Sequence, residues 1–165
     1  MVECAPVHSV LSRGSTIAIM ALIAVVGCAP ERDEETGELA EAGDIGVFQL
    51  EVGDCLADFQ DGTELSSVEA LPCSEPHSDE VYASGRIPDG DDFPGPEAVE
   101  TAARELCLAE YQDFVGLPYD DSVLDIGYLK PTEESWADGD REVLCTIFDP
   151  AAAEEVTGSL RGAKR

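Results

Sequence analysis

The spacing of hydrophobic and polar positions changes several times along the chain, and each change marks a predicted element. Short runs rich in Val, Ile, Leu and Tyr, bounded by Gly, Pro, Ser or Asp, predict β-strands. Five such runs are present: Gly46–Val52, Leu65–Pro72, Glu80–Ile87, Ser122–Leu129 and Arg141–Phe148. A polar turn at 137–140 joins the last two.

One segment has a helical spacing instead. Apolar residues within Glu97–Val115 recur at i, i+3, i+4 and i+7, which predicts an amphipathic helix. Pro96 suits the first turn, and Gly116 ends the helix. The order of three strands, one helix and two strands predicts an α+β fold, in which one main helix packs on a small antiparallel sheet.

The N-terminal segment predicts export. Residues 17–26 are ten consecutive apolar residues, fewer than the about 20 that a transmembrane helix needs but enough for a signal peptide. The following Val25-Val26-Gly27-Cys28 resembles the lipobox of bacterial lipoproteins. That resemblance implies a signal peptide over 1–27 and a diacylglycerol on Cys28, which would hold the protein on the outer face of the cell membrane. The alternative is an ordinary secretory signal with Cys28 an incidental thiol.

The chain is strongly acidic, with 36 Asp and Glu against 9 Lys and Arg and a formal charge of -27. This charge argues against a nucleic-acid partner, because phosphate contacts need clustered Lys and Arg. Residues 29–46 are acidic and lack aromatic residues, which predicts a disordered tether spanning roughly 23 Å. The alternative is a surface helix over Glu31–Ala42. We expect the domain at 47–160 and a loose basic tail at 161–165.

Four cysteines follow the tether: Cys55, Cys73, Cys107 and Cys145. An even number of widely spaced cysteines in an exported chain predicts disulfides, whereas in the cytosol the same four would suggest zinc. Three pairings are possible. We favour Cys55–Cys73, which links the first strands, and Cys107–Cys145, which fixes the helix to the last strand.

Several short motifs occur in a fixed order around these cysteines. They are Gly53-Asp54-Cys55, Pro72-Cys73-Ser74, Pro76-His77, Glu80-Val81, Phe93-Pro94-Gly95, Cys107, Pro131, Trp136, Gly139-Asp140-Arg141, Cys145 and Thr157-Gly158-Ser159-Leu160. Together they resemble the septum formation family over about residues 50–160. The resemblance implies a role in cell division or envelope assembly, and it supplies no catalytic residues.

His77 is the only histidine after the leader. With Glu75, Asp79 and Glu80 nearby it could act as a general base or a ligand, but a loop histidine hydrogen-bonded to the backbone is the favoured interpretation. Pairing with Cys73 as a nucleophile would need a free thiolate, which an oxidising compartment disfavours.

A second group of candidate binding residues lies near the predicted polar turn. Trp136 could pack its ring on the sheet, and Asp140 could form a local ion pair with Arg141. If Trp136 and Tyr128 are instead exposed, they would mark a partner surface.

The chain lacks the GxSxG, SxxK, HExxH, phosphate-loop and CxxC motifs, and its acidic runs lack the spacing of a calcium loop. We therefore predict no cofactor, no metal site and no enzymatic activity. The expected function is binding or scaffolding in septum formation or wall assembly, with cell-division or wall-synthesis proteins as partners and the membrane contacted through Cys28. The alternatives are a lipid-anchored sensor or solute-binding module for a small cationic ligand, and a secreted hydrolase that uses His77.

Overall fold

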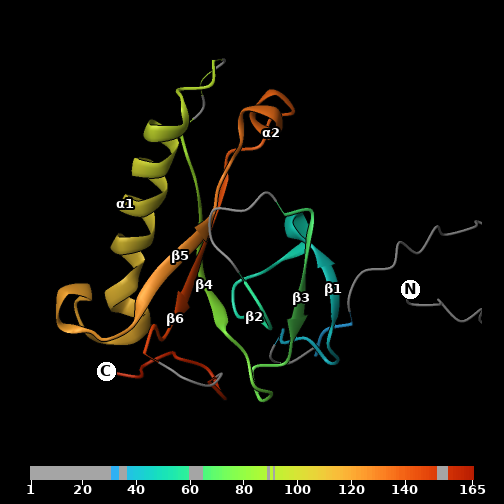
Figure 1. The fold of residues 1–165 in the computed structure, drawn as a ribbon, viewed down its shortest axis with the longest axis vertical. Coiled ribbons are helices and arrows are strands. Elements are labelled where there is room, and N and C mark those ends of the chain that lie inside the picture. The colour runs from blue at the N-terminus through green and yellow to red at the C-terminus, as the bar shows by residue number, and fades with distance from the viewer. Residues whose placement is uncertain (1–30, 34–36, 60–64, 89, 91, 152–155) are drawn as a thin grey trace, which may run out of the picture.

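The fold is a curled antiparallel sheet of six strands with one long helix on one side (Figure 1). This computed structural model describes residues 31–33, 37–59, 65–88, 90, 92–151 and 156–165. The strand order is β1-β3-β2-β4-β6-β5. The strands are β1 (Gly43–Gly46), β2 (Cys55–Leu56), β3 (Ser67–Leu71), β4 (Asp79–Arg86), β5 (Asp125–Leu129) and β6 (Glu142–Phe148). The predicted α+β class is confirmed.

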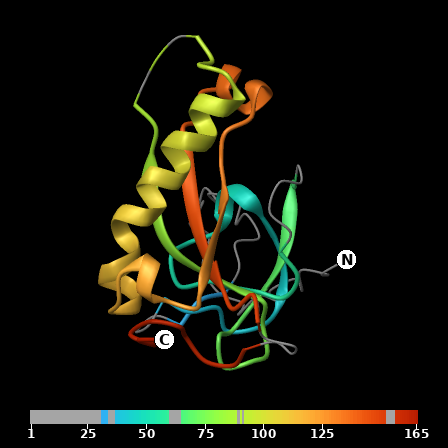
Figure 2. The same ribbon diagram turned by 60° about the vertical axis from the view of Figure 1, so that its left-hand side comes forward.

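The long helix α1 (Pro96–Val115) packs on β4, β5 and β6 (Figure 2). Its apolar stripe is buried as predicted, with Cys107 and Tyr111 fully covered at its centre. The helix ends at Gly116, whose φ of 83° is a left-handed conformation that glycine adopts without strain. The Gly116 N–H donates to the Gln112 carbonyl oxygen at 2.9 Å and completes the last turn.

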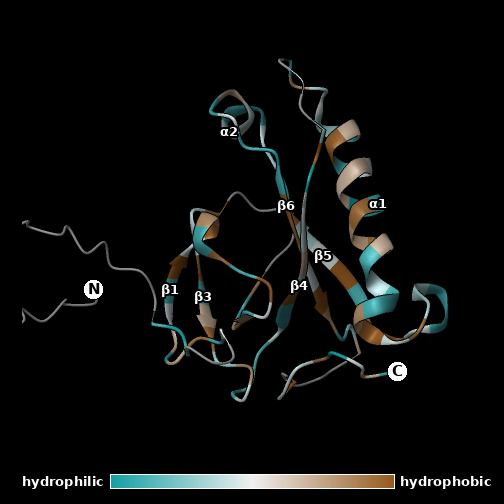
Figure 3. Ribbon diagram, turned by 180° about the vertical axis from the view of Figure 1, so that it is seen from behind, coloured by the Kyte–Doolittle hydropathy of each residue, from teal (hydrophilic) through white to brown (hydrophobic). Residues whose placement is uncertain are grey.

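The hydrophobic core consists of two clusters, which lie at different ends of the sheet. The larger lies between α1 and the strands β4, β5 and β6, and the smaller lies at the other end, around β1, β2 and β3. Figure 3 shows the hydrophobic segments of α1 and β5 in the first region and of β1 in the second. The smaller cluster includes Leu39 and Ile45, each only 4% exposed.

Residues 29–46 were predicted to form a disordered tether, and this is wrong for the described residues 31–33 and 37–46. Arg32 forms an isolated bridge with Leu39, and β1 pairs with β3. Leu39 and Ile45 supply enough apolar surface to dock this acidic segment, because each inserts into the smaller cluster. The alternative surface helix over Glu31–Ala42 is not formed by the described residues of that range.

The basic tail at 161–165 was predicted to be loose, and this is also wrong. The N–H groups of Gly162 and Lys164 donate to the carbonyl oxygens of Phe114 and Val115 at 2.7 and 3.0 Å. The Arg161 guanidinium lies 4.5 Å from the centre of the Phe114 ring. The tail therefore covers the carbonyl groups left free at the end of α1.

Three short helical segments were not predicted from the sequence, and the polar turn at 137–140 is present after one of them. The expected strand Gly46–Val52 contains only the last residue of β1, and the 3-10 helix η1 (Val47–Gln49) follows it. The predicted turn at 137–140 follows a helix, α2 (Glu133–Ala137), which begins with a capping box between Thr132 and Ser135. A second 3-10 helix, η2 (Tyr119–Asp121), precedes β5.

Among the described residues, no helix combines the length and the apolar character needed to cross a membrane. The predicted signal peptide at 1–27 and the lipidation site Cys28 lie outside the described residues.

Two buried tyrosines predict how stability depends on alkaline pH. Burial raises the pKa of Tyr82 and of Tyr111 above the ordinary value of 10.0. The folded state therefore keeps its phenol protons where the unfolded chain loses them. We expect a stability contribution that is complete below about pH 10 and falls as the pH rises further. Denaturant unfolding from pH 8 to 12 measures it; a Tyr82→Phe variant with the same alkaline slope as wild type would contradict the assignment to Tyr82.

Candidate functional site

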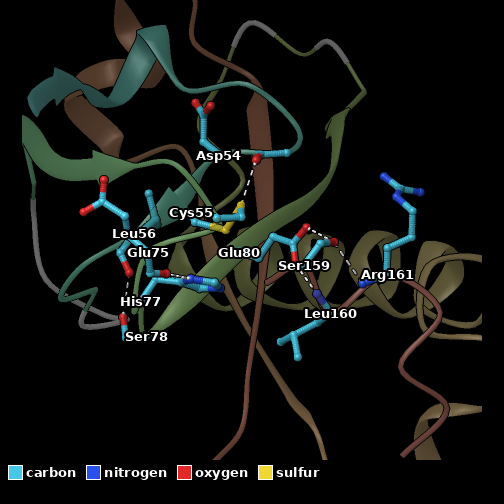
Figure 4. Close-up of a disulfide and its surroundings, with 12 residues drawn as sticks. Asp54, Cys55, Leu56, Glu75, His77, Ser78, Glu80, Ser159, Leu160 and Arg161 are labelled. Carbon is cyan, nitrogen blue, oxygen red and sulfur yellow. Dashed lines mark hydrogen bonds between the residues drawn. A yellow bond between two sulfur atoms is a disulfide. The ribbon is translucent and has the colours of Figure 1, made fainter. Parts of the chain in front are cut away.

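The predicted site residues fall into two separate regions. Cys55, Cys73, Glu75 and His77 lie around the end of β3 and the start of β4, whereas Trp136 and Arg141 lie at α2 and the start of β6. Figure 4 shows the first region.

Both predicted disulfides are formed. Cys55 in β2 is bonded to Cys73 in the loop after β3, with Cα atoms 5.2 Å apart. Cys107 in α1 is bonded to Cys145 in β6, with Cα atoms 5.4 Å apart. Glu80 lies close to the Cys55–Cys73 sulfurs, but these three side chains do not make a metal site because both sulfurs are committed to the disulfide.

His77 is fully buried and bonded to backbone. Its Nδ1 lies 2.8 Å from the Glu75 carbonyl oxygen, which can only accept, so Nδ1 carries the hydrogen in this contact. The N–H groups of His77 and Val156 each donate to the other's carbonyl oxygen at 2.9 Å. His77 Nε2 has no hydrogen-bond partner among the described residues. The backbone-bonded interpretation is supported, and the exposed Glu75 contributes its carbonyl group rather than its carboxylate.

Two of the buried carboxylates in this region, those of Glu80 and Asp54, make contacts between distant segments that the sequence did not predict. Glu80 is 2% exposed, and it accepts hydrogen bonds from Ser159 Oγ and the Leu160 N–H, both at 2.6 Å. Glu80 therefore joins β4 to the C-terminal segment (Figure 4). Both partners lie in motifs that carried the family resemblance, which was the only available signal of their contact.

Asp54 is the second buried carboxylate, and its side chain is fully covered. Its two oxygens accept from Arg32 Nη1 at 2.6 Å and Arg32 Nη2 at 2.9 Å. This hydrogen bond raises the pKa of Arg32 above its ordinary value. The Glu51 N–H also donates to Asp54 at 2.8 Å. The pair therefore fixes the segment before β1 to the turn before β2.

Trp136 of α2 and Arg141, just before β6, form a stacked pair. Trp136 is 3% exposed, and the Arg141 guanidinium lies 3.5 Å from the centre of its ring. Arg141 donates to the carbonyl oxygens of Trp136, Asp140 and Gly90 at 2.8, 2.5 and 3.0 Å. The structural interpretation of Trp136 is supported, since neither Trp136 nor Tyr128 is an exposed partner residue. Arg141 contacts the Asp140 carbonyl group, not the predicted carboxylate.

A groove of about 1070 Å³ opens between α2 and η1. One wall carries Val47, Phe48 and Phe59, and the other carries Thr132–Ser135 and Asp138–Asp140. Figure 1 shows α2 standing above the end of the sheet formed by β1 and β3. Sequence reasoning missed this groove, because its walls come from segments about 85 residues apart that only the curl of the sheet brings together.

The comparisons with known proteins support the resemblance. A family model described as septum formation matches residues 52–165. No curated protein and no solved structure matches the chain. The matched range contains both disulfides, His77, Glu80 and the Trp136–Arg141 pair, and it begins after β1. The chain therefore belongs to the septum formation family.

Proposed function

We propose that this protein acts in septum formation as a lipid-anchored, non-catalytic binding protein of the cell envelope. Membership of the septum formation family supports a role in septum formation. The binding role is supported by the difference between the buried polar groups and the open groove. The buried polar groups Asp54, His77 and Glu80 hold chain segments together, whereas the groove beside α2 stays open to solvent. Such a molecule has a surface for a partner and keeps these groups away from substrates.

The proposed location rests on the leader and the cysteines. The lipobox-like Val25-Val26-Gly27-Cys28 supports lipidation of Cys28, and two acyl chains are enough for stable anchoring. The two disulfides support an oxidising compartment, because thiols in the cytosol are kept reduced. Together these features favour the outer face of the cell membrane.

A localisation experiment in the native host tests this proposal. A fluorescently tagged protein should concentrate at division septa, and deletion should delay or distort septation. Cys28→Ser should abolish membrane retention, and mass spectrometry of the wild-type protein should find a mature N-terminus at lipid-modified Cys28. Uniform membrane signal with normal septa after deletion would contradict the septal role. A mature protein that keeps Met1 would contradict the anchor.

The acidic wall of the groove favours one second candidate, a lipid-anchored sensor or solute-binding module for a small cationic ligand. Glu133, Glu134 and Asp138 are exposed on that wall. Thermal-shift screening of the purified protein against cationic metabolites and peptidoglycan fragments separates the two candidates. A sharp shift with one small cation would favour the sensor.

A further inference from the structure

We propose that the groove between η1 and α2 binds a positively charged, extended segment of a partner polypeptide. This inference rests on the proposed binding role in septum formation and deepens it by naming the surface and the chemistry of the partner.

The first wall of the groove is aromatic and accessible. Phe48 in η1 is 70% exposed, and the half-buried Phe59 lies on the same wall. An exposed phenylalanine gains free energy when a partner covers it, at about 25 cal/mol per Å² of apolar area. The face of a phenyl ring also attracts ammonium and guanidinium groups. A segment with both apolar and basic side chains suits this wall.

The second wall carries negative charge. Of the described residues that line the groove, five are acidic (Glu133, Glu134, Asp138, Asp140 and Glu142) and only Lys130 is basic. Lys130 does not offset this charge, because its Nζ is 2.9 Å from a carboxylate oxygen of Glu100 on α1. Complementary charge attracts a cationic segment and repels an anionic one.

The acidic wall is also rigid. The capping box between Thr132 and Ser135 fixes the start of α2, and the Arg141–Trp136 stack fixes the turn after it. Ser135 Oγ donates to Asp140 at 2.8 Å and joins the two ends of the α2 turn. A preformed wall lowers the entropy cost of binding.

The open shape of the groove suits an extended segment of polypeptide. Pockets for small ligands enclose about 300–1,000 Å³ and surround most of the ligand. This groove has a volume of about 1070 Å³, but it is open to solvent and runs from η1 to the turn after α2. An extended segment with basic and apolar side chains can contact the acidic wall and the aromatic wall at once.

The test uses the full chain purified in a non-ionic detergent and a short, fluorescently labelled peptide of lysine and leucine. Binding is followed by fluorescence anisotropy at physiological ionic strength, where long-range attraction is largely screened. A glutamate–leucine peptide is the charge-reversed probe and should not bind. Glu133→Gln combined with Glu134→Gln should raise the Kd of the lysine peptide at least about fivefold.

Two matched controls isolate the groove from the overall charge of -27. Glu105→Gln combined with Glu110→Gln removes two exposed charges from α1, outside the groove, and should leave the Kd within about twofold. Phe48→Ala should also weaken binding, whereas Val123→Ala should not. Val123 is 59% exposed but lies outside the groove.

Three outcomes would overturn the inference. Equal weakening by the α1 and α2 double variants would show attraction to net charge alone. An unchanged Kd for Phe48→Ala would remove the aromatic wall from the site. The third outcome is that spermidine displaces the peptide at an equal concentration and responds to the Phe48→Ala and Glu133→Gln/Glu134→Gln variants as the peptide does. That result would make the occupant a small cation. None of these results contradicts the proposed septal function if deletion of the protein still disturbs septa. Failure of the groove inference can therefore be distinguished from failure of the proposed function.

Discussion

Removing the Cys107–Cys145 disulfide will lower the free energy of unfolding by about 4 kcal/mol. The bond closes a loop of sequence separation 38, and the chain-entropy relation gives a loss of that size when such a loop is opened. The effect is large because the bond joins the centre of α1 to β6, where both cysteines are fully buried. Urea unfolding of a Cys107→Ala/Cys145→Ala variant, followed by circular dichroism, measures it.

The second disulfide is the matched control. Cys55 and Cys73 are separated by 18 residues, so Cys55→Ala/Cys73→Ala should cost about 3 kcal/mol by the same relation. Reductant should lower the free energy of unfolding of the wild type. It should not change the free energy of unfolding of a variant in which all four disulfide cysteines are replaced by Ala. A loss below about 1 kcal/mol for the Cys107–Cys145 pair would contradict its role in fixing α1 to the sheet.

Asp54→Ala will lower the free energy of unfolding by about 3 kcal/mol and release the segment before β1. Loss of one partner of a buried ion pair costs about 3–5 kcal/mol, because the remaining charge is left without compensation. The lower end applies here, since the Arg32 side chain is 17% exposed and part of its charge stays hydrated. Urea unfolding gives the stability. Limited digestion with trypsin measures release of the segment before β1, because cleavage after Arg32 should become faster when the segment is free.

Glu51 provides the control for this pair. Its carboxylate lies 3.7 Å from Arg32 Nε and is 66% exposed, and surface pairs of this kind contribute about 0–1 kcal/mol. Glu51→Gln should therefore leave both stability and trypsin cleavage close to wild type. If Asp54→Ala behaves like Glu51→Gln, the Arg32–Asp54 contact does not hold the segment.

The sequence pattern predicted the elements whose signal is local and strong. The stripe that contains Cys107 and Tyr111 located α1 to within one residue at its start, because twenty residues of one period leave little ambiguity. The strands β4 and β6 were found for a similar reason, since each contains three consecutive buried apolar residues, 81–83 in β4 and 143–145 in β6. The favoured disulfide pairing is confirmed with them.

The elements that were missed depend on contacts between distant residues. Leu39 and Ile45 are isolated apolar residues in an acidic segment, so composition indicated disorder while burial at β3 produced a strand. Residues 47–52 alternate like a strand, yet η1 turns there and leaves Phe48 outside. The helix α2 has only five residues, too few for periodicity to reveal.

In the candidate site, too, local motifs could be found from the sequence but contacts between distant residues could not. The family motifs drew attention to Asp54, His77 and Glu80, but a motif does not state what its residues contact. Asp54 is paired with Arg32 across 22 positions, and Glu80 is bonded to Leu160 across 80. No local pattern encodes such partners, so their role in holding segments together became visible only in three dimensions.

The docking of Arg32 changes how far the protein can extend from a membrane. Only residues 29–31 separate Cys28 from Arg32, and four fully extended peptide units span at most about 14 Å. With the proposed lipid on Cys28, the β1 side of the sheet is therefore confined next to the headgroups. Opening of the Arg32–Asp54 contact and of β1 would lengthen this link to the 18 residues of 29–46, with a maximal reach of about 60 Å. With the proposed lipid on Cys28, the Arg32–Asp54 contact and the pairing of β1 with β3 would together set the distance between the membrane and the groove.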